Sequence, residues 1–229
     1  MARIVKEEEH ALKRNQILDV VQRLIYAKGY EQMSIQDILG DLQISKGAFY
    51  HYFNSKQALL EALIERMMQE AEQVITPIVY DPNLPAIEKF QRFFDTISRW
   101  KTARKKIMLA LMQSWYSDDN AIVRQKLSMA GLKWFAPYLT VIICQGVQEG
   151  VVTTPYPDQV SGVIISLMLG LGDAIAESFL PDGLNHEALQ HIDLTTVAVY
   201  TDAMERILGV PPNSILLMDP EILKEWEVS

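Results

Sequence analysis

The chain has 229 residues, of which 49% are hydrophobic and 22% charged, and this ordinary globular composition excludes collagen-like, coiled-coil rod and low-complexity proteins. The net charge of −8 opposes nucleic-acid binding by the chain as a whole, but the charge is unevenly distributed. Residues 1–56 contain eight Lys or Arg against seven Asp or Glu, whereas the remaining residues contain 13 against 22. Any contact with DNA is therefore expected in the N-terminal quarter.

The first 74 residues are predicted to form four helices separated by short turns. Apolar residues at spacings of three and four mark the first helix, and Gly29 serves as its C-cap. Ser34 and Asp37 have the spacing of a capping box, and Ser45 and Ser55 are in position to cap the next two helices. The predicted helices span about residues 7–28, 35–42, 46–52 and 56–74.

Residues 34–53 have the pattern of a helix-turn-helix, in which the first helix braces the DNA backbone and the second enters the major groove. Small Gly47 and Ala48 on the second helix allow close approach to base edges, and Lys46 supplies charge. The apolar residues that a three-helix core needs are also present: Ile35, Ile38, Leu39, Leu42, Ile44, Phe49 and Phe53, with Leu18, Val21 and Leu24. We expect a DNA-binding domain over residues 1–55.

Beyond Tyr80 the helical segments become longer and richer in Met and aromatic residues, so a second, larger helical domain is predicted over residues 56–229. Asp219 and Pro220 have the pattern of a helix start and predict a last short helix around Trp226. The other predicted helices span about 85–101, 104–117, 120–148 with Pro137 inside, 158–180 and 187–208. The whole chain is predicted to be all-α.

The helix-turn-helix stretch resembles the N-terminal domain of TetR-family regulators. The resemblance rests on Gly29-Tyr30, on the run from Met33 to Ile38, and on the run from Ile44 to Leu59, and it spans roughly residues 14–64. The family commonly has Ala-Gly where this chain has Leu42-Gln43. A residue other than glycine at a positive-φ turn position costs about 1 kcal/mol.

The resemblance implies a transcriptional regulator, usually a repressor, that binds double-stranded DNA. From the outward phase of the third helix, we expect bases to be read by Ser45, Lys46, Gly47 and Ala48. Phosphates are expected to be bound by Tyr50, His51 and Lys56. The candidate DNA-binding residues are Ser34, Ser45, Lys46, Gly47, Ala48, Tyr50, His51, Tyr52 and Lys56. A partner-binding surface without DNA contacts is the alternative role of this face.

The resemblance also implies that the C-terminal helices bind a small-molecule effector. The Met and aromatic side chains of the second domain favour an adaptable, largely apolar pocket, although core filling is the alternative role for each of them. The candidate effector-binding residues are Met67, Trp100, Met108, Met112, Trp115, Tyr116, Trp134 and Tyr138. The effector is expected to displace the long fourth helix and so to change the separation of two DNA-binding heads.

A homodimer is implied by the resemblance and favoured by the apolar residues of the last two long helices. Two such helices from each protomer would form a four-helix bundle, and its two-fold axis predicts a palindromic operator. The candidate interface residues are Val160, Val163, Ile164, Leu167, Met168, Leu171, Ile175, Leu189, Ile192, Val199, Ala203 and Ile207. An intrachain core is the alternative role of these residues.

The sequence motifs of enzymes and metal sites are absent. Of the four histidines, none has paired metal-ligand spacing, and HExxH, GxSxG, GxGxxG and P-loop strings do not occur. We therefore expect no catalytic residues, metal or cofactor; a helical adaptor and an enzyme with a sequence-distant site are the alternatives. The charged N-terminus, the short charge-free runs and the single Cys144 predict a cytoplasmic protein that does not cross a membrane.

Overall fold

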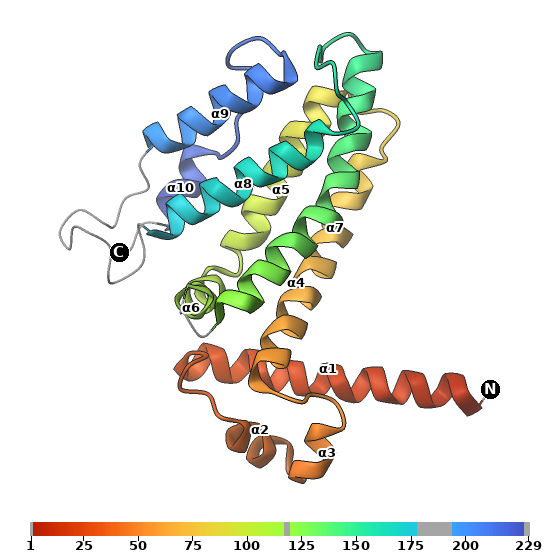
Figure 1. The fold of residues 1–229 in the computed structure, drawn as a ribbon, viewed down its shortest axis with the longest axis vertical. Coiled ribbons are helices and arrows are strands. Elements are labelled where there is room, and N and C mark those ends of the chain that lie inside the picture. Colours follow the sequence, from red (N-terminus) through yellow and green to blue (C-terminus); the bar gives the residue numbers. More distant parts are fainter. Residues whose placement is uncertain (1, 117–119, 178–193, 227–229) are drawn as a thin grey trace, which may run out of the picture. The chain divides into compact units, whose positions relative to one another are not determined.

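The computed structural model describes residues 2–116, 120–177 and 194–226, and all regular secondary structure in these ranges is helical (Figure 1). The all-α prediction is therefore confirmed. The helices are α1 (Ala2–Lys28), α2 (Ile35–Leu42), α3 (Lys46–Tyr50), α4 (Lys56–Val79), α5 (Ala86–Thr102), α6 (Lys105–Trp115), α7 (Ala121–Gln148), α8 (Val160–Glu177), α9 (Leu194–Leu208) and α10 (Pro220–Trp226).

Within the described residues, the helix boundaries that differ most from the sequence prediction are the start of α1 and the end of α4. Helix α1 begins at Ala2 rather than near residue 7, because nothing in the first residues breaks a helix. Helix α4 continues through Pro77 to Val79, so its predicted end near residue 74 is wrong. Ile75 and Val79 are both fully buried, and this packing outweighs the backbone hydrogen bond that Pro77 removes.

The chain forms two compact units, one comprising residues 1–68 with 106–127 and the other residues 69–105 with 128–229. Helix α4 contributes residues to both units. The predicted domain boundary after residue 55 falls at the start of this helix and stays a prediction.

The core of the first unit is built where α1 and α2 pack together and Phe49 of α3 inserts. Most of the predicted core residues are buried there, while Leu24, Ile35, Leu42 and Ile44 are only partly buried. The fully buried side chains of these three helices are Ile17, Leu18, Val21, Ile25, Ile38 and Phe49. Burial of these apolar side chains supplies most of the stability of such a small helical unit.

In the second unit, three phenylalanines of α5 pack with residues of α7, α8 and α9. Figure 1 shows α8 and α9 side by side, and these helices make extensive contact. Helix α7 is long and apolar enough, by length and composition, to cross a membrane. Its residues Leu139, Ile142 and Ile143 are buried against other helices of the unit.

Two polar side chains, one on α9 and one on α5, hold the backbone of the segment that follows α9. Buried Glu205 accepts the backbone N–H groups of Asn213 and Ile215 at 3.1 and 3.0 Å. Gln91 on α5 pairs with the backbone of Leu216, donating to its carbonyl at 2.6 Å and accepting from its N–H at 2.8 Å. These bonds satisfy backbone groups that a loop would otherwise leave to water.

Candidate DNA interface and effector-binding region

The start of α2 is fixed by the predicted capping box. The Ser34 hydroxyl accepts the Asp37 N–H at 3.2 Å, and the Asp37 carboxylate accepts the Ser34 N–H at 2.7 Å. Lys28 from the end of α1 adds an ion pair with Asp37 at 2.6 Å. The hydrogen bonds from Lys28 and Ser34 hold the pKa of Asp37 well below its usual range. Ser34 is exposed, as a DNA-contacting residue requires, but its hydroxyl is already engaged in the cap.

The turn between α2 and α3 has the geometry of a left-handed cap. Gln43 adopts φ 51° and ψ 41°, and its N–H donates to the Leu39 carbonyl. This is the position where the sequence predicts a cost for a residue other than glycine. Ser45 then caps α3, its hydroxyl accepting the Ala48 N–H at 3.2 Å.

Helix α3 has one buried anchor and an open outer face. Phe49 is completely buried, whereas the predicted base-reading residues are all exposed: Ser45, Lys46, Gly47 and Ala48. A Cβ added at Gly47 would meet only the Ser45 hydroxyl, at 4.0 Å, so the face above it is free. The Lys46 ammonium lies 5.9 Å from the ring centroid of exposed Tyr50. This face therefore combines small residues, a charge and a phenol within one turn of helix.

The end of α3 meets a side chain that the sequence interpretation missed. His51 is the C-cap of α3, and Tyr52 follows it. His10 of α1 lies against both, its ring centroid 5.5 Å from that of His51 and 4.7 Å from that of Tyr52. Helical spacing from His10 to Arg14 and Ile17 was the available signal, but it does not identify the partner.

Lys56 is partly buried at the start of α4, where it holds the turn that follows α1. Its ammonium donates to the Glu31 carbonyl at 3.0 Å and lies 4.4 Å from the ring centroid of Tyr30. The Tyr30 hydroxyl donates in return to the Lys56 carbonyl at 3.1 Å, and burial raises the pKa of this phenol. A phosphate contact by Lys56 would add to this structural role or replace it.

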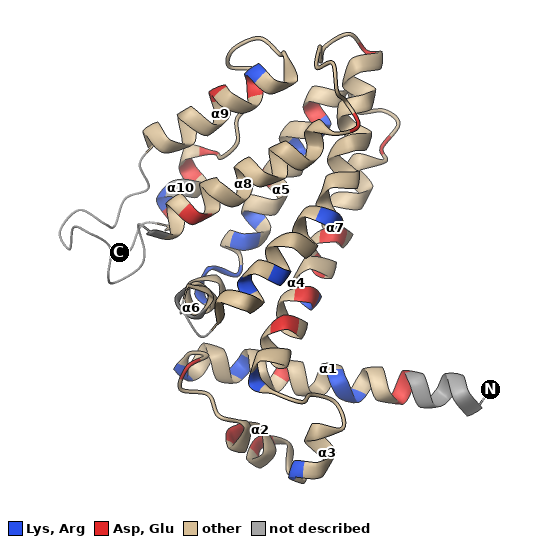
Figure 2. Ribbon diagram, in the orientation of Figure 1, with Lys and Arg blue, Asp and Glu red and all other residues tan. Residues whose placement is uncertain are grey.

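Both acidic residues of α2 form ion pairs with basic residues of α1. Figure 2 shows acidic positions on α2 and a basic position on α3. On α2, Asp37 pairs with Lys28, and Asp41 pairs with Arg23. Lys46 of α3 faces solvent. The pairing reduces the repulsion that α2 would exert on an approaching phosphate backbone.

The predicted effector-binding residues are divided between the two units. Trp100, Trp134 and Tyr138 belong to the second unit, and the other five belong to the first: Met67, Met108, Met112, Trp115 and Tyr116. Met67 is buried and the remaining seven are partly buried. Neither unit by itself brings the whole set together.

Within the second unit, Trp134 and Tyr138 of α7 converge on Glu72 of α4, a residue absent from the predicted set. The Trp134 indole N–H donates to Glu72 Oε2 at 2.8 Å, and the Tyr138 hydroxyl donates to Glu72 Oε1. This hydrogen bond to a carboxylate raises the pKa of Tyr138. Trp100 has a different environment, with the Arg104 guanidinium 4.3 Å from its ring centroid and bonded to Glu70 at 3.3 Å.

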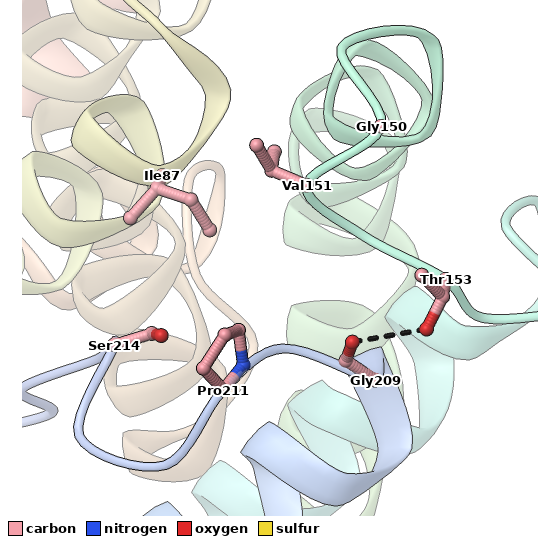
Figure 3. A pocket seen from close by; sticks show the side chains of 7 residues that line it. All are labelled: Ile87, Gly150, Val151, Thr153, Gly209, Pro211 and Ser214. Atoms are coloured by element: carbon pink, nitrogen blue, oxygen red, sulfur yellow. Dashed lines mark hydrogen bonds between the residues drawn. The ribbon is translucent and has the colours of Figure 1, made fainter.

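A cavity of about 490 Å³ lies elsewhere in the second unit (Figure 3). The lining comes from the start of α5, the segment after α7 and the segment after α9: Ile87, Gly150, Val151, Thr153, Gly209, Pro211 and Ser214. The Thr153 hydroxyl bridges two of these segments by donating to the Gly209 carbonyl at 2.9 Å. The eight predicted effector-binding residues do not line this cavity.

The predicted dimer residues of α8 and α9 fall into distinct classes of exposure. Val163 and Val199 are 49% and 62% exposed, whereas Val160, Ile164 and Leu171 are buried in the core of their own chain. Leu167, Met168, Ile175, Ala203 and Ile207 are partly buried. Leu189 and Ile192 lie outside the described residues. Exposed Leu169 and Leu194 lie on the same two helices and were not predicted.

Comparison with known proteins finds a matching family model for each of two parts of the chain. Residues 17–63 match the family model for bacterial regulatory proteins of the tetR family, and residues 105–173 match the model for a tetracyclin repressor-like C-terminal domain. The HTH-type transcriptional repressor DhaR of Mycobacterium sp. (strain GP1) is 22% identical over 158 residues, which cover 69% of this chain and 79% of that protein.

Solved structures share the fold. A TetR-family transcriptional regulator from Pectobacterium atrosepticum has a TM-score of 0.61 at 19% identity, covering 90% of this chain and 97% of its own. The SmeT–triclosan complex has a TM-score of 0.59 at 16% identity, with the same two coverages. At these identities the likeness concerns the fold.

Proposed function

Since this chain belongs to the TetR family of transcriptional regulators, we propose that it is a cytoplasmic repressor that leaves a palindromic operator when a small effector binds. The observation that carries the proposal is the exposed face of α3. There, Gly47 and Ala48 leave the helix surface free, while buried Phe49 fixes its orientation. A helix presented in this way can enter the major groove and contact base edges.

The test is a gel shift with the DNA that lies upstream of the gene for this chain, and a coding fragment of equal length serves as the control. We expect a discrete complex with the upstream fragment that survives an excess of the coding fragment. Ala48→Glu places a negative charge on the outer face of α3 and should abolish the complex, whereas Ala48→Ser should keep it. A complex that forms equally with both fragments would contradict sequence-specific binding.

The proposed repressor is a homodimer whose interface lies on α8 and α9. Support comes from the exposed apolar side chains of the two helices, which include Val163, Leu169, Leu194 and Val199. Exposed apolar area marks contact surfaces, and these side chains lie on two helices that pack side by side. Because Val160, Ile164 and Leu171 already pack inside their own chain, the proposed interface depends on the exposed residues.

The proposed effector is small and largely apolar, and its binding residues belong to the helices that follow the DNA-binding domain. SmeT, a protein with the same fold, has been solved with triclosan, and DhaR is named as a repressor. Helix α4 supports coupling, since it runs without interruption from Lys56 at the DNA-binding end to Val79. A thermal-shift screen of small molecules, followed by operator binding at saturating ligand, tests this part of the proposal. A tenfold loss of operator affinity requires about 1.4 kcal/mol of preference for the released state.

A further inference from the structure

His10 is held at the edge of the DNA-binding face by its position on α1. It continues the stripe formed by Arg14, Ile17 and Val21, of which the last two are fully buried. The Arg14 guanidinium lies 5.1 Å from the ring centroid of Phe53, so this stripe faces the residues that follow α3. His10 therefore lies on the side of α1 that meets the end of α3.

The rings of His10, His51 and Tyr52 form one cluster at this edge. The His10 and His51 centroids are 5.5 Å apart in an edge arrangement, and His51 lies 5.2 Å from Tyr52. Both histidines are exposed, and neither imidazole forms an ion pair or a hydrogen bond with another described residue. Their ring nitrogens are therefore available to a ligand.

The ionisable groups on the elements that meet here are of both signs. Carboxylates are present only on α1, and basic groups are present on α1, on α3 and at the start of α4. These residues are Glu8, Glu9, Lys13, Arg14, Lys46 and Lys56, with the phenols of Tyr50 and Tyr52. The elements that carry the cluster therefore present basic groups as well as the exposed acids of α1.

We propose that His10 and His51 form one phosphate-binding site for double-stranded DNA, and that protonation of the two imidazoles strengthens DNA binding. This inference rests on the proposed function, since it needs the α3 face to approach DNA. It adds α1 to the DNA-contacting surface through His10.

The chemistry follows from the charge of the two rings. Histidine ordinarily changes charge between pH 5 and 8, and its cationic form donates from both ring nitrogens. Two cationic rings at 5.5 Å repel each other in the free protein, and a phosphate anion bound to both relieves that repulsion. DNA binding should therefore be accompanied by proton uptake, and it should strengthen as the pH falls.

The test uses fluorescence anisotropy of a labelled duplex of random sequence, because a phosphate contact does not depend on base sequence. The proteins are the unmodified chain, His10→Gln, His51→Gln and His10→Arg. The matched control is His186→Gln with His191→Gln, which removes the other two histidines of the chain. Each is measured at pH 6 and pH 8 over a range of salt concentrations, and circular dichroism monitors folding.

We expect the unmodified chain and the control to bind about three- to tenfold more tightly at pH 6 than at pH 8, with a salt slope steeper by about 0.9 for each imidazole that contacts a phosphate. His10→Gln and His51→Gln should each lose much of this gain. His10→Arg should bind tightly at pH 8 and show a weaker pH dependence, because its charge does not titrate.

A His10→Gln protein with the pH profile and salt slope of the unmodified chain would overturn the assignment of His10. Loss of the pH dependence in the control but not in His10→Gln or His51→Gln would overturn the site as a whole. If the unmodified chain binds no duplex at either pH, DNA binding itself fails, and this inference fails with it.

Discussion

Arg66 on α4 forms an ion pair with Asp19 on α1, in which Arg66 Nη1 lies 2.7 Å from Asp19 Oδ1. The second guanidinium nitrogen donates to Gln22 on the same helix, also at 2.7 Å. The side chain of Arg66 is only 16% exposed, and its Nε is buried with no hydrogen-bond partner among the described residues. A two-pronged contact of this kind fixes orientation as well as distance, so α1 should follow a movement of α4.

Arg66→Met should weaken operator binding while it leaves the salt slope unchanged, because Arg66 contacts α1 and not phosphate in this account. The methionine keeps the apolar stem and removes both hydrogen bonds, so the loss of stability should stay near 1 kcal/mol. Gel shifts and thermal denaturation measure the two effects. Arg92→Met, which removes an exposed pair with Glu88 on α5, is the control and should alter neither. Equal operator affinity in Arg66→Met and the unmodified chain would contradict a role of the Arg66 contact with α1 in operator binding.

Asp37 should make the DNA-binding domain sensitive to acid. Its pKa is lowered in the folded state by hydrogen bonds from Lys28 and Ser34. A lowered folded pKa stabilises the fold above the unfolded pKa of about 4, and this contribution disappears as the pH falls through the folded value. Thermal denaturation between pH 3 and pH 6 should show a steeper loss for the unmodified chain than for Asp37→Asn. Parallel curves would show that the capping box carries no charge-dependent stability.

Lys56 has a structural contact and a predicted phosphate contact, and the two roles leave different signatures. Lys56→Met removes the hydrogen bond to Glu31 in either case. If Lys56 also binds phosphate, the salt slope of DNA binding should fall by about 0.9. We expect this fall together with weaker binding of every duplex. A lower affinity with an unchanged slope would limit Lys56 to holding the turn.

Cys144 should be a slow nucleophile. Burial and the neighbouring carboxylate of Asp158, 3.6 Å from the sulfur, raise the pKa of the thiol. Because the thiolate is the reactive form, alkylation by iodoacetamide at neutral pH should be slower than that of an unhindered thiol. Cys144→Ser should retain operator binding. Rapid alkylation that releases DNA would instead reveal a reactive thiol whose modification affects DNA binding.

Val199→Arg should convert the proposed homodimer into a monomer. Val199 is 62% exposed on α9, and two arginines placed across a two-fold interface would be desolvated without partners. Sedimentation equilibrium at micromolar concentration measures the mass. Ile122→Arg, at an exposed residue of α7 outside the proposed interface, is the control and should remain a dimer. A Val199→Arg dimer would move the interface elsewhere.

Local sequence signals predicted the helix-turn-helix well because its determinants are close in sequence. The hydroxyls of Ser34 and Ser45 each accept the backbone N–H of the residue three positions later in the sequence. Gln43 occupies the turn position that the pattern indicates. The contacts that were missed join residues far apart along the chain. Arg66 meets Asp19, and Glu72 meets Trp134, in each case on another helix. Helical periodicity gives the face of each side chain but not the helix that will cover it.

The effector-binding residues could not be predicted for the same reason. Met and aromatic residues fill cores and line pockets alike, and only packing separates the two roles. Pro77 illustrates a related limit, because a proline ends helices in general but is accepted where burial of Ile75 and Val79 compensates.

The most direct test of the account is selection of DNA sites from a random library by the purified chain. We expect enrichment of an inverted repeat whose half-sites lie about one helical turn apart or a multiple of it, and loss of that enrichment with Ala48→Glu. Recovery of unenriched sequence, with affinity that depends on salt alone, would contradict sequence-specific recognition by α3.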